Sequence, residues 1–474
     1  MKFQSTRGGV SGLSFQDVVM SGYASDNGMY MPMEIPKLSE ETLKSWANLS
    51  YKDIVKEISK LFIEDEIPAE KICELIDAGF ETFKDPSSPI VTKTLAEDVK
   101  LLEMFHGKTL AFKDLSMCCT AQFINYFLDQ SNSSATLLIA TSGDTGSSAL
   151  HAMSSIERVD IIVLLPKDRI SQVQERQMTS VVSDNCHVIR ADGTSDDTDV
   201  PLRKAFLDGE LVKKHKLGTL NSVNWSRMMV QIAHHVYAYF EGKRTNPETD
   251  TVVFIPTGGL GNATAGCIAR EMGLPIQMVC AVTNDALHRA VYNCDYSVTE
   301  LTVSLASAMN LQVIYNFERI LYLLSDMDTS LVKKIQEDYQ ERNKSTIPET
   351  LVNKLKEFMR VTKVTDEDII ETIKRCADEN GGYVICPHTA SALSAAYSLE
   401  ALKDHNAVIY AAASPAKFSD ALERAGVQWT GRNLAEELAA KEVRYTDWEA
   451  SDDWLQKLLE LLDTIHARRS AHSK

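Results

Sequence analysis

The sequence predicts an α/β protein built on parallel sheets with helices on both faces, preceded by a mostly helical N-terminal domain. Three observations support this fold class. Short apolar runs alternate with amphipathic stretches over most of the chain, which is typical of βαβ units. Two of these runs end in glycine-rich turns that lead into helices. The 474 residues, of which 44% are hydrophobic, leave room for about two to four domains with substantial cores.

The first 95 residues predict a separate N-terminal domain. Glycines and prolines punctuate its first part, and a helical stretch follows from Ser39 to about Phe83. The segment Asp85–Pro89 contains two prolines and predicts a boundary.

After this boundary the chain alternates between strands and helices. The predicted strands are Thr136–Ala140, Asp160–Leu165, His187–Arg190, Thr251–Ile255, Ile276–Thr283, Tyr383–Cys386 and Ala407–Ala413. The predicted helices are Leu115–Asp129, Ser171–Val181, Trp225–Glu241, Ala263–Met272 and Ala390–Leu402. Residues 325–375 are charged and are predicted to be helical without a strand.

Composition excludes several classes of function. The net charge of −17 disfavours binding to nucleic acid, because the phosphate backbone would be repelled. None of the nine cysteines forms a C-x-x-C pair, and no H-E-x-x-H motif occurs, so no metal site is predicted. No apolar run approaches the ~20 residues that span a bilayer. We therefore expect no membrane partner and a cytoplasmic protein, with a mitochondrial address left open.

The first motif that could take part in catalysis is His106–Asp114. Lys113 follows an apolar stretch and precedes a predicted helix. A desolvated lysine at such a place has a depressed pKa and forms an imine with an aldehyde. The alternative for any single lysine is a solvated side chain at a helix start.

Two strand–turn–helix motifs follow. Ile139–Ala149 carries small and hydroxyl residues in its turn, and Phe254–Gly266 carries four glycines. Backbone N–H groups at a helix N-terminus form anion sites for a carboxylate or a phosphate. The alternatives are an ordinary helix cap for the first turn and glycines needed for positive φ in the second. In the nearby pair His234–His235 we expect packing rather than metal binding.

Together the three motifs suggest a cofactor with an aldehyde and a phosphate next to a substrate carboxylate, which fits pyridoxal 5′-phosphate. These motifs resemble those of the threonine synthase family, which belongs to the tryptophan-synthase-β-like (fold type II) group of pyridoxal phosphate enzymes. Within this family the chain is most similar to the animal branch of threonine synthase-like 2 proteins. The similarity covers nearly the whole chain. The segments that carry it are Met1–Gly8, Ala24–Pro32, Phe105–Asp114, Thr141–Gly146, Gln174–Thr179, Asn221–Arg227, Pro387–Ala390 and Pro415–Phe418.

The resemblance implies a domain organisation and a set of cofactor-binding residues. It implies an N-terminal domain (1–95), a large domain that binds the cofactor (96–130 and 222–420), a smaller mobile α/β domain (131–221) and a C-terminal helical segment (421–474). Lys113 would form the Schiff base and move protons. The other cofactor-binding residues implied are Phe112, Asp144, Gly258, Gly259, Leu260, Gly261, Asn262 and Ser414.

The substrate-binding residues implied by the resemblance are Ser142, Gly143, Thr145, Asn224 and Arg227. The partner is expected to be a small phosphorylated amino acid, and a homodimer stays open.

The chain departs from the usual family pattern at several places. Gly259 and Leu260 replace the Asn and Phe of a G-N-F-G loop, Cys386 replaces an acid, and Ala412 replaces the threonine that contacts the pyridine nitrogen. Either Ser414 or water would then contact that nitrogen. A phospho-lyase that converts O-phosphohomoserine to 2-oxobutyrate, phosphate and ammonia is favoured, since animals are not expected to make threonine. O-phosphothreonine would give the same product by a simpler β-elimination. The alternatives are a threonine synthase and a non-catalytic binding or signalling protein.

Overall fold

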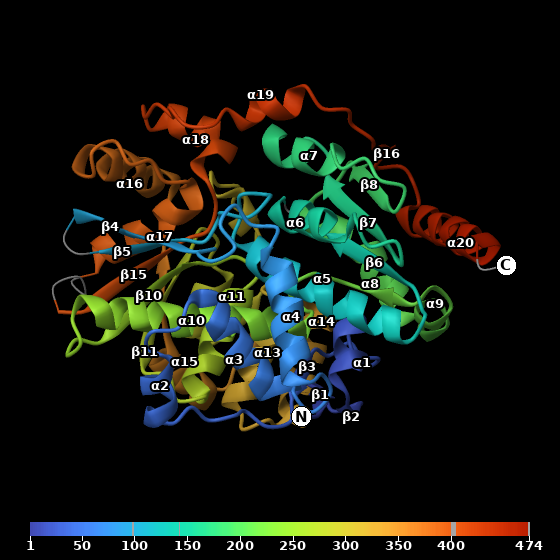
Figure 1. Cartoon of the computed structure of the whole chain (residues 1–474), viewed down its shortest axis with the longest axis horizontal. Helices are drawn as coiled ribbons and strands as arrows, with labels where there is room; N and C mark the ends of the chain where they lie inside the picture. The colour runs from blue at the N-terminus through green and yellow to red at the C-terminus, as the bar shows by residue number, and fades with distance from the viewer. Residues whose placement is uncertain (97–98, 142, 400–403, 473–474) are drawn as a thin grey trace.

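The computed structural model describes residues 1–96, 99–141, 143–399 and 404–472, which form four sheets with helices around them (Figure 1). The smallest of these sheets pairs residues 295–297 with residues 344–346 in antiparallel orientation. The sheet of the N-terminal part has three strands in the antiparallel order β2-β1-β3. Its strands are β1 (Phe3–Ser5), β2 (Ser11–Leu13) and β3 (Tyr30–Pro32). The helices of this part are α1 (Phe15–Met20), α2 (Glu40–Trp46), α3 (Tyr51–Ile63) and α4 (Ala69–Phe80). The helical stretch predicted from Ser39 is thus present as three helices, with Ser39 and Ser50 as side-chain caps.

The largest sheet has six strands in the order β14-β11-β10-β15-β5-β4, and all neighbours are parallel except β5 and β4. The strands are β4 (Val91–Thr94), β5 (Lys100–Glu103), β10 (Thr251–Pro256), β11 (Ile276–Val282), β14 (Met359–Lys363) and β15 (Asn406–Ala411). Helices α10 (Trp225–Thr245) and α11 (Gly261–Glu271) cover one face, and α16 (Asp366–Glu379) and α17 (Pro387–Ser398) lie on the other (Figure 1). The predicted α/β class with helices on both faces is therefore confirmed.

The remaining sheet has five parallel strands in the order β16-β8-β7-β6-β9. The strands are β6 (Ala135–Ala140), β7 (Val159–Pro166), β8 (Cys186–Ala191), β9 (Leu217–Gly218) and β16 (Thr446–Trp448). The accompanying helices are α6 (Asp144–Met153), α7 (Gln172–Thr179), α8 (Ser195–Leu207), α9 (Gly209–His215) and α20 (Trp454–His472). The central strand β7 is buried along its whole length, which explains its unbroken apolar run.

Three predictions about strands are wrong. Tyr383–Cys386 forms no strand, because it leads directly into the N-cap of α17, where the Cys386 sulfur accepts the N–H of Thr389. Conversely, residues 325–375 contain β13 (Lys344–Thr346) and the edge strand β14. The C-terminal segment contributes β16 as well as helices. These strands have only three to five residues and each is only partly buried, so they lack the apolar run that reveals a buried strand.

The remaining elements connect the layers. They are α5 (Lys113–Gln130), α12 (Ala286–Asn293), β12 (Asp295–Ser297), η2 (Ser307–Met309), α13 (Phe317–Leu324), α14 (Thr329–Arg342), α15 (Glu349–Phe358), η4 (Pro415–Lys417), α18 (Ser419–Arg424) and α19 (Leu434–Ala439). Within the part of the chain that the structure describes, we find no helix with the length and apolarity needed to cross a membrane.

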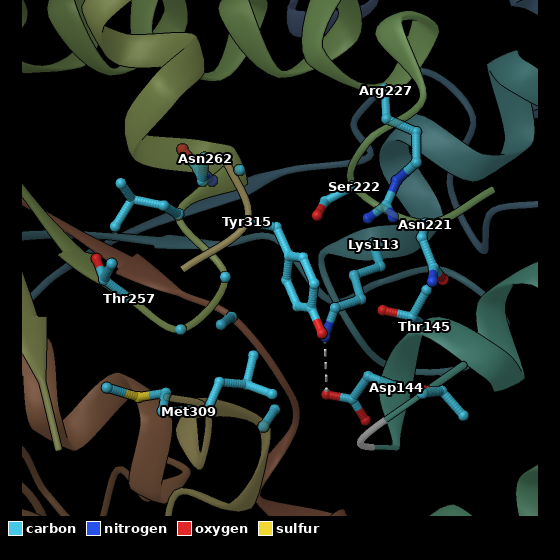
Figure 2. A pocket seen from close by; sticks show the side chains of 18 of the residues that line it. Lys113, Asp144, Thr145, Asn221, Ser222, Arg227, Thr257, Asn262, Met309 and Tyr315 are labelled. Carbon is cyan, nitrogen blue, oxygen red and sulfur yellow. Dashed lines mark ion pairs between the residues drawn. The ribbon is translucent and has the colours of Figure 1, made fainter. Parts of the chain in front are cut away.

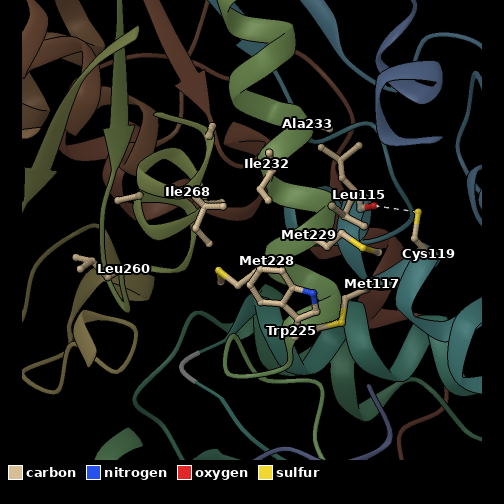
Figure 3. Close-up of a cluster of buried hydrophobic side chains, with 14 of the residues drawn as sticks. Leu115, Met117, Cys119, Trp225, Met228, Met229, Ile232, Ala233, Leu260 and Ile268 are labelled. Atoms are coloured by element: carbon tan, nitrogen blue, oxygen red, sulfur yellow. Dashed lines mark hydrogen bonds between the residues drawn. The ribbon is translucent and has the colours of Figure 1, made fainter. Parts of the chain in front are cut away.

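Helix α10 lies at the centre of the main core (Figure 3). Its residues Trp225, Met228 and Ile232 are fully buried and pack among side chains of α5 and α11 such as Leu115 and Ile268. Helix α5 begins at Lys113 and α11 begins at the end of the glycine-rich turn. The core therefore fixes the N-terminal ends of α5 and α11 relative to each other. The candidate site lies at these two helix ends.

Candidate active site

A pocket lies at the carboxyl ends of β6 and β10 and brings most of the predicted site residues together (Figure 2). Ligands in open α/β folds bind at this edge of the sheet. The predicted residues that line it are Phe112, Lys113, Asp144, Thr145, Arg227, Gly258, Gly259, Leu260, Gly261 and Asn262. They come from segments as far apart in sequence as α5, α6, α10 and α11.

Lys113 is the first residue of α5, and its side chain is only 15% exposed. The N–H of Phe112 donates to the carbonyl of Ala412 at 2.7 Å, which ties this helix start to the end of β15. Burial lowers the pKa of Lys113 to about 8, although the nearby Asp144 acts in the opposite direction. Its Nζ lies 5.4 Å from the centre of the Phe112 ring and 3.8 Å from Oδ2 of Asp144. A substantial share of this amine is therefore neutral near physiological pH and able to act as a nucleophile or a base.

Asp144 is held by a buried network that the sequence did not reveal. Its Oδ1 accepts hydrogen bonds from Lys417 Nζ at 2.7 Å and from Gln174 Nε2 at 2.9 Å. Burial alone would raise the pKa of Asp144, but Lys417 and Lys113 hold it well below its usual range. Lys417 is fully buried and also donates to the carbonyl of Thr109 at 3.0 Å. The carboxylate is thus charged, fixed in place and directed at the Lys113 amine.

The turn that leads into α6 also contributes to the pocket. Gly143, the N-cap of α6, has φ of +135°, and a β-carbon there would lie 2.5 Å from Nε2 of Gln174. Thr141 Oγ1 accepts the N–H groups of Gly143 and Gly146, both at 3.0 Å. Ser142, which was predicted to bind substrate, lies outside the described residues.

The glycine-rich loop leaves its backbone open toward the pocket. Among the described residues, the amides of Gly258, Gly259 and Leu260 find no backbone acceptor. The first amides of α11 also have no partner within the helix. The only positive φ in this loop belongs to Leu260, at +67°, so positive φ does not explain the glycines. Gly258 is needed because a β-carbon would lie 2.8 Å from the carbonyl oxygen of Ala308.

Arg227 supplies a buried positive charge on the other side of Lys113 from the glycine loop in Figure 2. Its Nη1 donates to the carbonyl of Leu220 at 2.9 Å and its Nε to the hydroxyl of Ser116 at 3.5 Å, and no carboxylate among the described residues pairs with it. Burial lowers its pKa to about 10, so the guanidinium stays charged at neutral pH. Asn221 lies nearby with a buried Oδ1 that has no partner among the described residues. A buried cation without a counter-charge favours an anionic ligand.

Three predicted residues lie outside the pocket lining, namely Gly143 in the turn described above, Ser414 and Asn224. Ser414 is buried outside the lining, and its hydroxyl caps η4 by accepting the N–H of Ala416 at 3.3 Å. The neighbouring Ala412 lines the pocket instead. Asn224 is fully buried as the N-cap of α10, and its Nδ2 donates to the carbonyls of Val19 and Thr219. Local capping therefore accounts for both polar side chains.

Sequence reasoning also missed residues that line the pocket from other elements. They are Tyr23, Ser195, Asp199, Gln231, Tyr315 and His388. Nε2 of His388 accepts the N–H of Ala308 at 3.1 Å, and burial lowers the pKa of His388 to about 4. His388 and Lys417 lie in motifs quoted for the family resemblance, which was the only available signal. Tyr315 comes from a loop without a pattern, so nothing in the sequence singled it out.

Comparisons with known proteins agree over nearly the whole chain. The family described as "Threonine synthase N terminus" matches residues 2–80, and the family described as "Pyridoxal-phosphate dependent enzyme" matches residues 88–411. The chain is 43% identical to threonine synthase-like 2 of Xenopus laevis, over 99% of this chain and 100% of that protein. It is 34% identical to threonine synthase of Eremothecium gossypii, over 92% and 91%. A crystal structure of threonine synthase from Brucella melitensis with bound pyridoxal phosphate superimposes with a TM-score of 0.88 at 31% identity, over 99% of this chain and 100% of that one.

Proposed function

The chain belongs to the threonine synthase family of pyridoxal-phosphate-dependent enzymes, and from this premise we propose that it is a phospho-lyase. The proposed substrate is O-phosphohomoserine, with O-phosphothreonine as a second substrate of the same class. The products are 2-oxobutyrate, phosphate and ammonia. The observation that carries the proposal is the position of Lys113 between two sites suited to anions, the glycine loop and Arg227.

The residues of the pocket fit pyridoxal phosphate. Lys113, with a pKa of about 8, suits a covalent bond to the aldehyde, and the open amides of Gly258, Gly259 and Leu260 suit the phosphate. A β-carbon at Gly259 would meet nothing closer than 3.7 Å, so this side of the loop has room for a ligand. When bound, the cofactor withdraws electrons from the α-carbon of an amino-acid substrate and makes its proton acidic.

Lys113 is proposed to move the protons. Its Nζ takes one proton from the α-carbon and then one from the β-carbon; one of these protons is returned to the γ-carbon and the other leaves with the phosphate. Asp144, ionised and 3.8 Å away, stabilises the protonated amine between these transfers. Thr145 and the start of α6 are proposed to bind the substrate carboxylate.

Arg227 is proposed to bind the phosphate of the substrate. Its guanidinium lacks a carboxylate partner among the described residues and lines the same pocket as Lys113. The phosphate leaves the γ-carbon with the electron pair of the carbon–oxygen bond. Water then hydrolyses the released enamine, so that O-phosphohomoserine and one water give 2-oxobutyrate, ammonia and phosphate.

If water instead added to the β-carbon after phosphate had left and before the product was released, the product would be threonine. Relatives that are 40–43% identical come from animals such as Xenopus, mouse and human, and animals are not expected to make threonine, which favours the lyase. Relatives named threonine synthase at 32–34% identity keep the synthase as the second candidate.

One incubation separates these functions. Purified holoenzyme is mixed with O-phosphohomoserine, and phosphate, 2-oxobutyrate and threonine are measured together. Equal amounts of phosphate and 2-oxobutyrate support the lyase, whereas equal amounts of phosphate and threonine identify a synthase. Release of no phosphate above the level of a Lys113→Ala variant would leave only a binding role.

A further inference from the structure

Two adjacent histidines in α10 lie behind the start of α11, outside the pocket lining. His234 and His235 are both fully buried. Nε2 of His235 lies 2.9 Å from the main-chain carbonyl oxygen of Asn262, and Nδ1 of His234 lies 3.3 Å from Nδ2 of the same residue. Asn262 is the second residue of α11 and lines the pocket at the end of the glycine loop. The pair therefore contacts both the backbone and the side chain of one residue of the loop.

The hydrogen-bond partners define the tautomer of His235. A carbonyl oxygen only accepts, so Nε2 must carry the proton. Nδ1 then accepts, and the hydroxyl of Tyr410 lies 3.2 Å from it. Tyr410 is a buried residue of β15, in the middle of the large sheet. A chain of two hydrogen bonds thus connects the sheet through His235 to the first turn of α11.

The packing around His235 keeps its ring in this place. Gly266 lies one helical turn after Asn262, and a β-carbon there would come within 2.7 Å of Cε1 of His235. The same β-carbon would lie 2.2 Å from the sulfur of Met278. Gly266 therefore permits a close approach of α10 and α11, and the imidazole occupies the space that a side chain would need. Burial lowers the pKa of His235 to about 4, so the ring stays neutral at physiological pH.

We propose that His235, oriented by Tyr410, is a positioning residue for the phosphate of pyridoxal phosphate. By holding the carbonyl of Asn262, it fixes the direction of the first peptide planes of α11 and therefore of the amides that face the pocket. The inference rests on the proposed role of residues 258–262 as the phosphate site.

The experiment compares His235→Leu with His235→Gln in the full chain. The glutamine Nε2–H occupies nearly the position of the imidazole Nε2–H, so it can still donate to Asn262, whereas leucine cannot. Cofactor is removed and added back, the dissociation constant of pyridoxal phosphate is measured by titration, and the ³¹P chemical shift of the bound phosphate is recorded. Loss of one buried hydrogen bond corresponds to about a tenfold weaker affinity. We expect about this loss and a displaced ³¹P signal for His235→Leu, and near wild-type values for His235→Gln.

Tyr410→Phe gives an independent test that removes one hydroxyl and little volume. If Tyr410 acts only through His235, Tyr410→Phe shifts the ³¹P signal when His235 is present. The double variant Tyr410→Phe/His235→Leu then has the same signal as His235→Leu alone. Wild-type affinity and ³¹P shift in both His235→Leu and Tyr410→Phe would overturn the inference. If His235→Leu does not fold, the Tyr410→Phe variant decides the matter, and an unchanged ³¹P signal in it overturns the inference.

Gly261→Val separates this inference from the proposed function. If Gly261→Val displaces the ³¹P signal and His235→Leu does not, only the role of His235 fails. If neither variant moves the signal, the phosphate does not bind at the glycine loop, and the proposed cofactor site fails with it.

Discussion

At the scale of single residues, the charges around Lys113 determine its reactivity. Burial lowers its pKa, and the positive charges of Arg227 and Lys417 act in the same direction, while Asp144 opposes them. Lys417 also forms an ion pair with Asp144, because its Nζ lies 2.7 Å from Oδ1 of this ionised carboxylate. The protonation state of the Lys113 amine therefore depends on Lys417, which does not line the pocket.

Lys417→Met tests this dependence through pH. The neutral amine reacts with the aldehyde, so the rate at which cofactor-free protein takes up pyridoxal phosphate should rise with pH around pH 8, the pKa of Lys113. Removing the charge of Lys417 removes one influence that lowers this pKa and leaves Asp144 to pair with Lys113, so the midpoint should move to higher pH. The rate is followed by absorbance in stopped flow. Lys44→Met, at an exposed position, is the control and should leave the midpoint unchanged.

Substitutions in the glycine loop should differ by position. A β-carbon at Gly261 would lie 3.1 Å from Cε of Met228 and 3.3 Å from Cβ of Ser222, so Gly261→Val should weaken retention of pyridoxal phosphate by about tenfold or more. At Gly259 the nearest atom is 3.7 Å away, and Gly259→Asn should be far milder. Retention is measured by dialysis and absorbance. Equal retention by the two variants would mean that the loop does not hold the phosphate.

At the scale of elements, short polar segments limited what the sequence could predict. Long apolar strands such as β7 and β10 were found, because burial on both faces gives an unbroken apolar run. The edge strand β14 was missed, since only part of it is buried. Ser414 and Asn224 were assigned to the site because a sequence cannot show whether a polar side chain faces a pocket or caps its own helix, and both are caps.

Ser414→Ala should therefore affect stability more than catalysis. The variant loses the cap of η4, which costs about 0.5–2 kcal/mol for a capping residue. We expect a lower midpoint of urea unfolding and a rate of phosphate release within about threefold of the wild type. A loss of activity larger than tenfold, with unchanged stability, would instead place this hydroxyl in the reaction.

At the scale of the whole molecule, the pocket is assembled from distant parts of the chain. Tyr23 comes from the N-terminal part, Asp144 from α6, which follows the first strand of the five-stranded sheet, Lys113 from α5 and Tyr315 from the loop before α13. Arg203 of α8 lies over the rings of both Tyr23 and Tyr315, 5.7 and 4.9 Å from their centres. The motifs predicted many of the residues that line the pocket with Lys113. Contacts between distant segments without a repeating pattern could not be predicted.

Removal of pyridoxal phosphate should destabilise the whole chain, because the pocket is lined by residues from distant parts of it. A ligand that binds only the folded state stabilises it by about 2.7 kcal/mol at a concentration of 100 times its dissociation constant. We expect a lower melting temperature for the cofactor-free protein in calorimetry, restored by added cofactor. In Lys113→Ala the cofactor can bind only non-covalently, so its addition should raise the melting temperature less. Identical melting temperatures with and without cofactor in the wild type would contradict a pocket built between these parts.

The central claim is that Lys113, and no other lysine, carries the cofactor. Reduction of the holoenzyme with borohydride fixes the cofactor to its lysine, and peptide mapping by mass spectrometry then locates it. The fully buried Lys417 lies close to the same carboxylate, Asp144, and is the most demanding comparison. We predict the modification on the peptide that contains Lys113 alone. Modification of Lys417 or of any other lysine, or no modification at all, would contradict the account.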